Sequence, residues 1–255
     1  DWVQSKSWLG SGFSYTLVQN DEIVAMLSCA NENPQTAWIR YFVCSRQVHY
    51  PTAFNELIQV ALHDLKSVGL LSLHALASQE WVQRLLENEG FSFHDEIVTL
   101  FLDINEDSIP QGMNSLENQA FTFRPIEDND LAALYTIDQK AFPPAWQLGM
   151  ENLEQCAKNS NQKYLAFDLD KAVAYLMSES IFGNQHLSRI AVDPNYQGQH
   201  LASALIQKML AEGYAQGVRR FSVNTNRANH ASLALYKRFG YALSEQTVPV
   251  YAFQI

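Results

Sequence analysis

Hydrophobic positions in the second half of the chain follow two periods, which predict a succession of strands and helices. In segment 201–216, apolar residues recur at 201, 205 and 209 and again at 202, 206 and 210. That spacing is typical of an amphipathic helix with a wide buried face. Further helices are predicted at 127–142, 150–158 and 229–239. Strands are predicted at 121–126, 163–167, 173–178, 187–192, 221–223, 241–244 and 248–253.

The first half of the chain repeats the later part of this β-α-α-β-β-β-α-β-α-β-β order. Residues 57–59 match residues 205–207 as Leu-Ile-Gln at an offset of 148, and Gly90 matches Gly240 at an offset of 150. Three strands are expected ahead of these matches, at 14–18, 23–28 and 37–43. We interpret the repeat as an internal duplication. Only about 13 residues precede the first of these strands, so we expect the first copy to lack the opening strand and two helices.

A polar stretch at 104–119, which contains Pro110 and Gly112, is the expected linker between the copies. We therefore predict two tandem domains, at residues 1–117 and 118–255. The expected fold class is α/β (α+β), with a mixed central sheet flanked by helices in each domain and an incomplete N-terminal copy.

Charge separates the two copies. Residues 1–118 hold 15 acids and 5 bases, whereas residues 119–255 hold 12 of each, so the formal net charge of −10 lies in the first part. No block of basic residues is present, which argues against a nucleic-acid ligand. A polyanionic cofactor is expected to prefer the neutral second part. The acidic first part favours a second ligand that is cationic.

Composition excludes further classes of protein. Hydrophobic residues make up 47% of the chain and charged residues 17%, which fits a packed globular protein rather than a disordered one. No apolar run approaches the ~20 residues of a membrane helix. The three cysteines, Cys29, Cys44 and Cys156, follow no metal-binding pattern. They are expected to be reduced thiols, which indicates a cytoplasmic protein.

The segment 190–206, which reads IAVDPNYQGQHLASALI, is the strongest candidate for chemistry. A strand is expected to end at Val192, Asp193 and Pro194 turn the chain, and a helix is expected to begin near Leu201. Free backbone amides and the helix dipole make the start of such a helix an anion site suited to a pyrophosphate. Gly198 permits close approach of the backbone to a ligand.

About 25 residues further on, the chain reads N-x-x-S-x-x-x-Y-x-x-x-G-Y from Asn229 to Tyr241. With both motifs, the second copy resembles the GNAT N-acetyltransferase superfamily, and most closely its branch that acetylates the N-termini of ribosomal proteins. In the first motif, His200 stands where the family has its central glycine. Ser232 and Tyr241 stand where the second motif has alanine and phenylalanine.

The resemblance implies direct transfer of an acetyl group from acetyl-CoA to an amine. It implies that Tyr236 protonates the departing thiolate and that the amide of Val192 stabilises the oxyanion. Asn229 is expected to bond the pantetheine arm, and Arg227 and Lys237 to bind the 3′-phosphate. The remaining cofactor-binding positions implied are Ile190, Ala191, Gln197, Gly198, Gln199, His200, Leu201, Ala202 and Ser203.

The residue that accepts the amine's proton is left open between Glu179 and His186, which flank the turn between two central strands. The first copy is expected to be non-catalytic, because Leu86 and Gln79 stand at the positions of Tyr236 and Asn229. It is expected to pack on the second copy, complete its sheet edge or line its acceptor cleft. Two alternatives stay open: a non-catalytic acyl-CoA-binding or scaffold protein, and an enzyme that transfers another acyl group.

Overall fold

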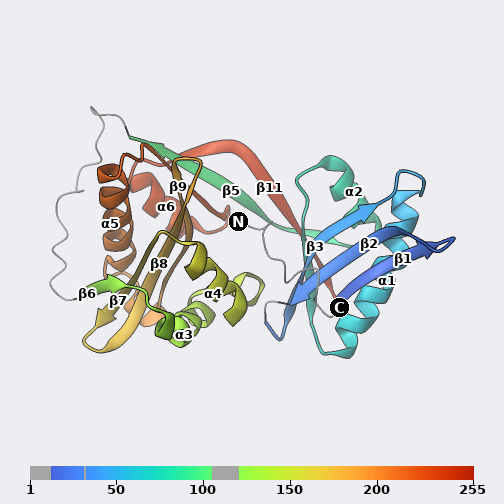
Figure 1. Cartoon of the computed structure of the whole chain (residues 1–255), viewed down its shortest axis with the longest axis horizontal. Coiled ribbons are helices and arrows are strands. Elements are labelled where there is room, and N and C mark those ends of the chain that lie inside the picture. Colours follow the sequence, from blue (N-terminus) through green and yellow to red (C-terminus); the bar gives the residue numbers. More distant parts are fainter. Residues whose placement is uncertain (1–12, 32, 105–120) are drawn as a thin grey trace. The chain divides into compact units, whose positions relative to one another are not determined.

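The computed structural model describes residues 13–31, 33–104 and 121–255, which form two compact units. Unit 1 comprises Asp1–Glu96 with Val248–Ile255, and unit 2 comprises Ile97–Thr247. The predicted boundary at 117/118 lies outside the described residues. The units differ from the predicted contiguous domains, because a segment of each half of the chain belongs to the other unit (Figure 1).

Unit 2 is a mixed sheet with helices on both faces, in the order β11-β5-β10-β9-β8-β7-β6. Its pairings are antiparallel where registers are given, except that β9 and β10 run parallel. The strands are β6 (Thr122–Pro125), β7 (Gln162–Asp168), β8 (Lys171–Ile181), β9 (Asn184–Val192), β10 (Arg220–Asn226) and parts of β5 (Ser92–Asp103) and β11 (Ala242–Gln254). The helices are α3 (Leu131–Ala141), α4 (Met150–Asn159), α5 (Leu201–Ala215) and α6 (His230–Arg238), with short 3-10 turns at Asp128–Asp130, Pro144–Trp146 and Pro194–Tyr196.

Alternation along β8 divides the core of unit 2 into two layers. Ala174 and Leu176 pack in a cluster with α5, whereas Tyr175 and Met177 pack in a cluster with α3 and α4. Successive side chains of a strand point to opposite faces, so α5 covers one face of the sheet and α3 with α4 covers the other. The predicted periodicity of 201–216 is confirmed, since the helix buries Leu201, Leu205, Ile206, Met209 and Leu210.

Unit 1 repeats the later half of this arrangement, with the sheet order β1-β2-β3-β4-β11-β5. Its elements are β1 (Phe13–Gln19), β2 (Glu22–Asn31), β3 (Thr36–Cys44), α1 (Tyr50–Ser67), β4 (Ser72–Leu76), α2 (Glu80–Asn88) and the remaining parts of β5 and β11. The predicted lack of an opening strand and two helices concerns residues ahead of β1, which lie outside the described residues. One continuous core joins α1 and α2 to the sheet.

Strands β5 and β11 each begin in one unit and end in the other. In unit 2, residues 97–103 of β5 pair with β10, and in unit 1, Val250 to Gln254 of β11 pair with β4. The sequence predicts two strands at 241–244 and 248–253, but the structure has one. The intervening residues 245–247 include no glycine or asparagine, the residues that adopt the left-handed conformation of a tight hairpin, so the strand continues.

No helix in the described part of the chain combines the length and the apolar character that crossing a bilayer requires.

Candidate active site in the second half of the chain

Strands β9 and β10 separate at the centre of unit 2. They pair in parallel only at Gln185–Leu187 with Phe221–Val223. Beyond these residues β9 follows β8 as far as Val192, and β10 follows β5 as far as Asn226. A β-bulge accompanies the separation, because Leu187 and Arg189 face consecutive residues of β8 and Ser188 is extra. Bulges bend the strand that carries them, which accounts for the divergence.

The divergence leaves one edge of β9 without a strand partner among the described residues. The amide of Asp193 donates to the carbonyl of Val173 on β8, at 2.8 Å. Amides alternate in direction along an antiparallel strand, so the preceding amide, that of Val192, points away from β8 and toward the open side. An acyl oxygen placed there would meet a donor that is already oriented.

The loop after β9 is held by a buried carboxylate. Asp193 is 1% exposed. Its carboxylate accepts a hydrogen bond from the amide of Asn195 at 3.0 Å and forms an ion pair with Lys140 at 3.0 Å. Burial alone would raise the pKa of Asp193, but these donors hold it below its usual value. The carboxylate is therefore charged at neutral pH and fixes the turn at the end of the strand.

Two residues with positive φ then turn the chain into α5. Gly198 has φ 77° and His200 has φ 63°, the latter in the left-handed region that glycine tolerates best. The family's central glycine is thus explained by backbone conformation at this position. A β-carbon on Gly198 would meet no atom within 4 Å, so the loop borders open space.

The first turn of α5 supplies free donors beside that space. The amides of Leu201, Ala202 and Ser203 have no acceptor within the helix, because the first intrahelical bond runs from Ala204 to the carbonyl of His200. Gln197, Gly198, Gln199 and His200 are exposed. This exposed cradle of amides at a helix N-terminus fits a pyrophosphate group.

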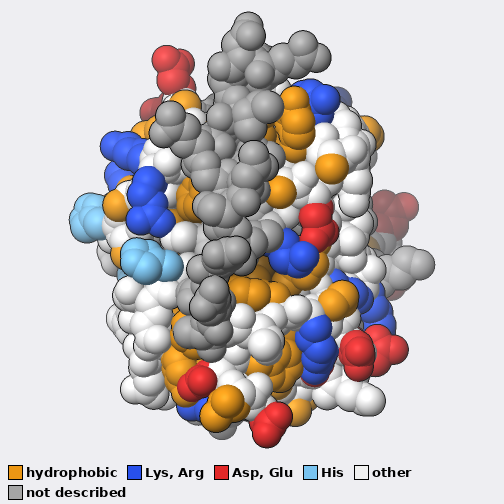
Figure 2. All heavy atoms as spheres, turned by 90° about the vertical axis from the view of Figure 1, so that its left-hand side faces the viewer, with side chains coloured by type: hydrophobic (Ala, Val, Ile, Leu, Met, Phe, Trp, Pro, Cys, Tyr) orange, Lys and Arg blue, Asp and Glu red, His pale blue; other side chains and the backbone are white. Residues whose placement is uncertain are grey.

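Arg238, which was not among the predicted site residues, brings a positive charge to the same helix end. Its guanidinium, on α6, donates to the hydroxyl of Ser203 on α5, 35 residues away. The predicted partners of the 3′-phosphate are both exposed. Arg227 lies just before α6, and Lys237 lies on α6. Figure 2 shows Lys, Arg and His side chains side by side at one edge of a face of unit 2.

Helix α6 positions the two predicted residues of the second motif. Asn229 is its N-cap, and its side-chain oxygen accepts from the amide of Ser232 at 3.1 Å, which leaves the side-chain NH₂ group as a donor. Tyr236 is 3% exposed and shares a hydrophobic cluster with Leu187 and Val223, the last paired residues of β9 and β10. Burial raises the pKa of Tyr236, so the phenol keeps its proton at neutral pH.

Glu179 and His186 are cross-strand neighbours on β8 and β9. The His186 ring is buried and its Nδ1 lies 2.8 Å from the hydroxyl of Ser222. Burial lowers the pKa of His186 to about 4, although Glu179 opposes the shift. Val192 is six positions after His186 on β9, and six residues of strand span about 20 Å. The structure therefore brings these two candidates together, but away from the amide of Val192.

Sequence reasoning missed a buried ion pair that ties β9 to the helices above it. Arg189 donates to Asp138 on α3 at 2.9 and 3.0 Å, and to the carbonyl of Trp146 at 2.7 Å. Asp138 is fully buried and also accepts from the amide of Leu148 and from the hydroxyl of Tyr175. The network fixes the segment between α3 and α4 against the strand that carries Val192. The partners lie 51 residues apart, and no local pattern links them.

Comparisons with known proteins address the same region. The model of the acetyltransferase (GNAT) family matches residues 131–241. The [ribosomal protein bS18]-alanine N-acetyltransferase of Escherichia coli (strain K12) is 32% identical over 123 residues, which are 47% of this chain and 80% of that protein. The enzyme of the same name from Haemophilus ducreyi is 27% identical over 116 residues, 46% of this chain and 79% of that protein.

Solved structures resemble the chain over nearly its full length. A GCN5-related N-acetyltransferase from Sphaerobacter thermophilus has a TM-score of 0.62 at 18% identity, covering 94% of this chain and 80% of the other. A tandem GNAT protein from the clavulanic acid biosynthesis pathway has a TM-score of 0.60 at 10% identity, covering 94% and 82%. These likenesses show the fold, the mixed sheet flanked by helices that was predicted. The chain therefore belongs to the GNAT family of N-acetyltransferases, and residues 131–241 carry the match.

Proposed function

We propose that unit 2 transfers an acetyl group from acetyl-CoA to the α-amino group of a polypeptide. The observation that carries this proposal is the separation of β9 and β10 beside the N-terminus of α5. An unpaired edge of β9, next to a cradle of amides, suits a cofactor with an amide-bearing arm and a pyrophosphate. The E. coli relative is named for an alanine of a ribosomal protein, so peptide α-amines are the first acceptors to test.

The residues of the site divide the binding of acetyl-CoA among them. The amides of residues 198–203 and the guanidinium of Arg238 would hold the pyrophosphate, and Arg227 and Lys237 the 3′-phosphate. The side-chain NH₂ of Asn229 would donate to the pantetheine arm, which runs along Ile190, Ala191 and Val192. Bound there, the cofactor supplies an activated thioester.

Acyl transfer forms a C–N bond and breaks a C–S bond. The neutral amine attacks the thioester carbonyl, and the amide of Val192 stabilises the oxyanion that develops. Departure of the thiolate would draw the proton of Tyr236 to sulfur, and the proton that the nitrogen gives up as the amide forms would restore the phenol. A thiol pKa near ~8.5 lies below the raised pKa of the phenol, so proximity and the dry surroundings must assist this proton transfer.

The residue that accepts the amine's proton is either Glu179 or His186. An α-ammonium has a pKa near ~8, so a His186 of pKa about 4 is a much weaker base than the amine, and an ordinary carboxylate is no stronger. A chain of waters would have to connect Glu179 to the amine, given the length of β9 between them.

All three cysteines are free thiols, which supports the cytoplasm as the compartment.

The test is release of free thiol when the protein is incubated with acetyl-CoA and a panel of peptides with different N-terminal residues. Tyr236→Phe is expected to lower kcat toward the 10²–10⁴-fold that general acid catalysis typically contributes, with little change in coenzyme A affinity. Tyr214→Phe, a phenol on α5, is the matched control and is expected to keep full activity. An unchanged kcat in Tyr236→Phe across several pH values would remove Tyr236 from the mechanism.

A further inference from the structure

A cavity of about 310 Å³ lies within unit 1. It forms where β3 and β4 separate, since these strands pair in parallel only at Thr36–Trp38 with Ser72–His74. Beyond that point β3 follows β2 to Cys44, and β4 follows β11 to Leu76. A volume of this size is at the lower end of the range for small-molecule sites.

The separation has the same cause as the one in unit 2. Ile39 and Tyr41 face consecutive residues of β2, so Arg40 is extra and forms a β-bulge, as Ser188 does on β9. The amide of Ser45 donates to the carbonyl of Val24 on β2 at 2.7 Å. Alternation then turns the amide of Cys44 to the side from which β4 has departed. An extended chain lying in the gap would find backbone donors and acceptors along it.

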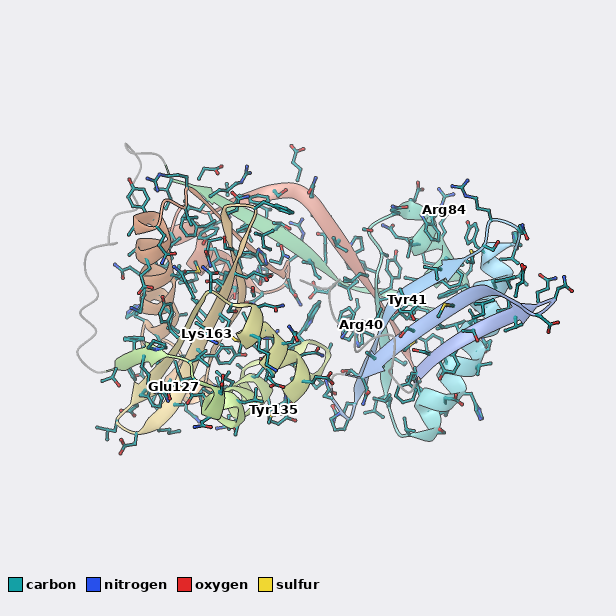
Figure 3. The ribbon with its side chains drawn as sticks, viewed as in Figure 1. Arg40, Tyr41, Arg84, Glu127, Tyr135 and Lys163 are labelled. Carbon is teal, nitrogen blue, oxygen red and sulfur yellow. The ribbon has the colours of Figure 1, made fainter. Side chains whose placement is uncertain are left out.

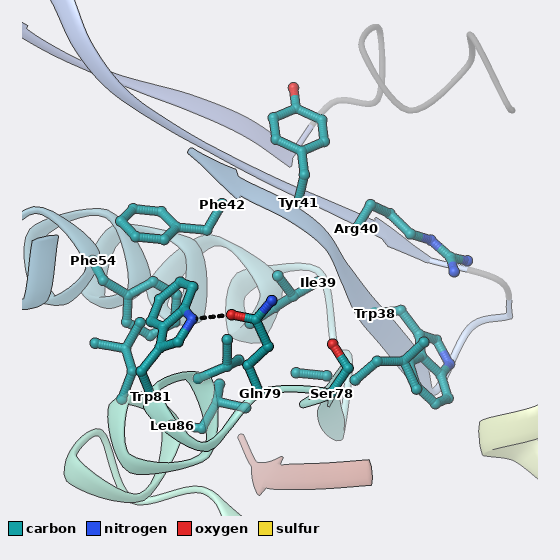
Figure 4. Close-up of a pocket in the computed structure, with 14 residues that line it drawn as sticks. Trp38, Ile39, Arg40, Tyr41, Phe42, Phe54, Ser78, Gln79, Trp81 and Leu86 are labelled. Atoms are coloured by element: carbon teal, nitrogen blue, oxygen red, sulfur yellow. Dashed lines mark hydrogen bonds between the residues drawn. The ribbon is translucent and has the colours of Figure 1, made fainter. Parts of the chain in front are cut away.

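The walls of the cavity are aromatic and aliphatic. The lining includes six large apolar side chains: Trp38, Ile39, Phe42, Phe54, Trp81 and Leu86. Figure 4 shows the indole NH of Trp81 donating to the side-chain oxygen of Gln79, while Tyr41 points away from the other lining side chains. Trp81 is 44% exposed, and Tyr50 packs edge-on against it with ring centroids 5.4 Å apart.

Charge at the cavity is sparse. No Asp, Glu or Lys is among its lining residues, and Arg40 is the one charged side chain. Figure 3 places Arg40 beside Tyr41 on β3. A multiply charged amine would therefore find no counter-charge in this cavity.

The loop between β3 and α1 offers no cradle for a phosphate either. Residues 44–51 include no glycine and no residue with positive φ, unlike 198–200 in unit 2. Pro51 is the second residue of helix α1. Proline has no amide hydrogen, so it removes one of the free donors that would bind an anion at the helix start.

We propose that this cavity is a second binding site, for an extended, uncharged chain that carries amide groups and an apolar end and has no phosphate. The open edge of β3 pairs with the amides of the chain, and the aromatic walls hold its apolar end. Short apolar peptides and S-acyl-pantetheine without its nucleotide share this chemistry. The site is separate from the proposed acetyl-transfer site, since all its lining residues belong to unit 1.

The experiment is calorimetric titration of the full chain with S-acetyl-pantetheine and with a capped phenylalanine peptide, each in the presence of saturating coenzyme A. Coenzyme A serves to fill unit 2 first, and its own binding is measured separately. We expect at least one of the two probes to bind. Which probe binds more tightly distinguishes a peptide ligand from an acyl-pantetheine ligand. Ser78→Phe places a ring at the exposed rim and is expected to weaken that binding at least tenfold. Ser92→Phe, an exposed serine of β5 outside the cavity, is the matched control.

Failure of both probes to bind at millimolar concentration would overturn the proposal, as would binding that survives Ser78→Phe. Thermal unfolding of both variants checks that each is folded. Failure of coenzyme A to bind, with probe binding that Ser78→Phe abolishes, would overturn the proposed function of unit 2 and leave this site standing.

Discussion

Replacement of His200 by glycine is expected to stabilise the protein, although it removes a side chain. His200 has φ 63° at the N-cap of α5, and its side chain is exposed. A residue with a β-carbon loses about 1–2 kcal/mol in the left-handed conformation. Glycine relieves that strain but gains about 0.4–1 kcal/mol of conformational freedom in the unfolded chain. The net gain in unfolding free energy should therefore be between about 0 and 1.5 kcal/mol, with little packing lost.

His200→Ala separates strain from the effects of the ring. Alanine keeps the β-carbon and so retains the strain, so His200→Ala should leave the unfolding free energy close to that of the wild type. Urea unfolding of the three proteins, followed by circular dichroism, measures both differences. An unfolding free energy of His200→Gly below that of His200→Ala would refute the assignment of strain to this residue, because glycine would then show only its cost in conformational freedom.

Coenzyme A affinity in the same variants reports on the ring itself. If the imidazole donates to a phosphate, both variants should bind about 5- to 30-fold more weakly, the value of a hydrogen bond of ~1–2 kcal/mol. If the ring only crowds the cradle, His200→Gly should bind more tightly than the wild type. Calorimetry distinguishes the two cases, and equal affinity in all three proteins would contradict both.

Three further predictions concern other parts of unit 2. Tyr241→Phe should raise the unfolding free energy by about 1 kcal/mol or more, because the buried Tyr241 hydroxyl has no partner among the described residues. As a control, Tyr164→Phe should lower the unfolding free energy, because the Tyr164 hydroxyl donates to Glu212. Asp138→Asn should cost about 3–5 kcal/mol in urea unfolding, because Arg189 loses its buried counter-charge, whereas Asp128→Asn at an exposed site should cost little. Arg238→Ala should weaken coenzyme A binding up to about fivefold, less so at high salt, and an effect independent of salt would contradict a phosphate contact.

Local patterns predicted the elements of unit 2 well, because a helix such as 201–216 is encoded by its own periodicity. The duplication was also visible, since Leu57 and Leu205 occupy matching helices, α1 and α5. Contacts between distant residues were not predictable in this way. Arg189 meets Asp138 only after α3 has packed on the sheet, and Arg238 reaches Ser203 only after α6 has packed beside α5.

Backbone conformation was the second limit of the sequence. The motif shows that His200 stands where the family has glycine. From the sequence, the expected effect of its β-carbon is to crowd the phosphates of the cofactor. The structure adds a left-handed φ at that position, which no side-chain pattern reveals. Burial was similarly hidden, because the sequence does not show that the His186 ring lies in the interior beside Ser222.

The passage of β5 and β11 between the units has a consequence for biosynthesis. Leu76 on β4 pairs with Val250 on β11, more than 170 residues later in the chain. At about 5–20 residues per second, a ribosome needs roughly 10–35 seconds to make that segment. During this interval the edge of β4 stays open to pairing with another nascent or misfolded chain. Unit 1 is begun first but completed last, so a chaperone that shields strand edges should raise the yield of folded protein.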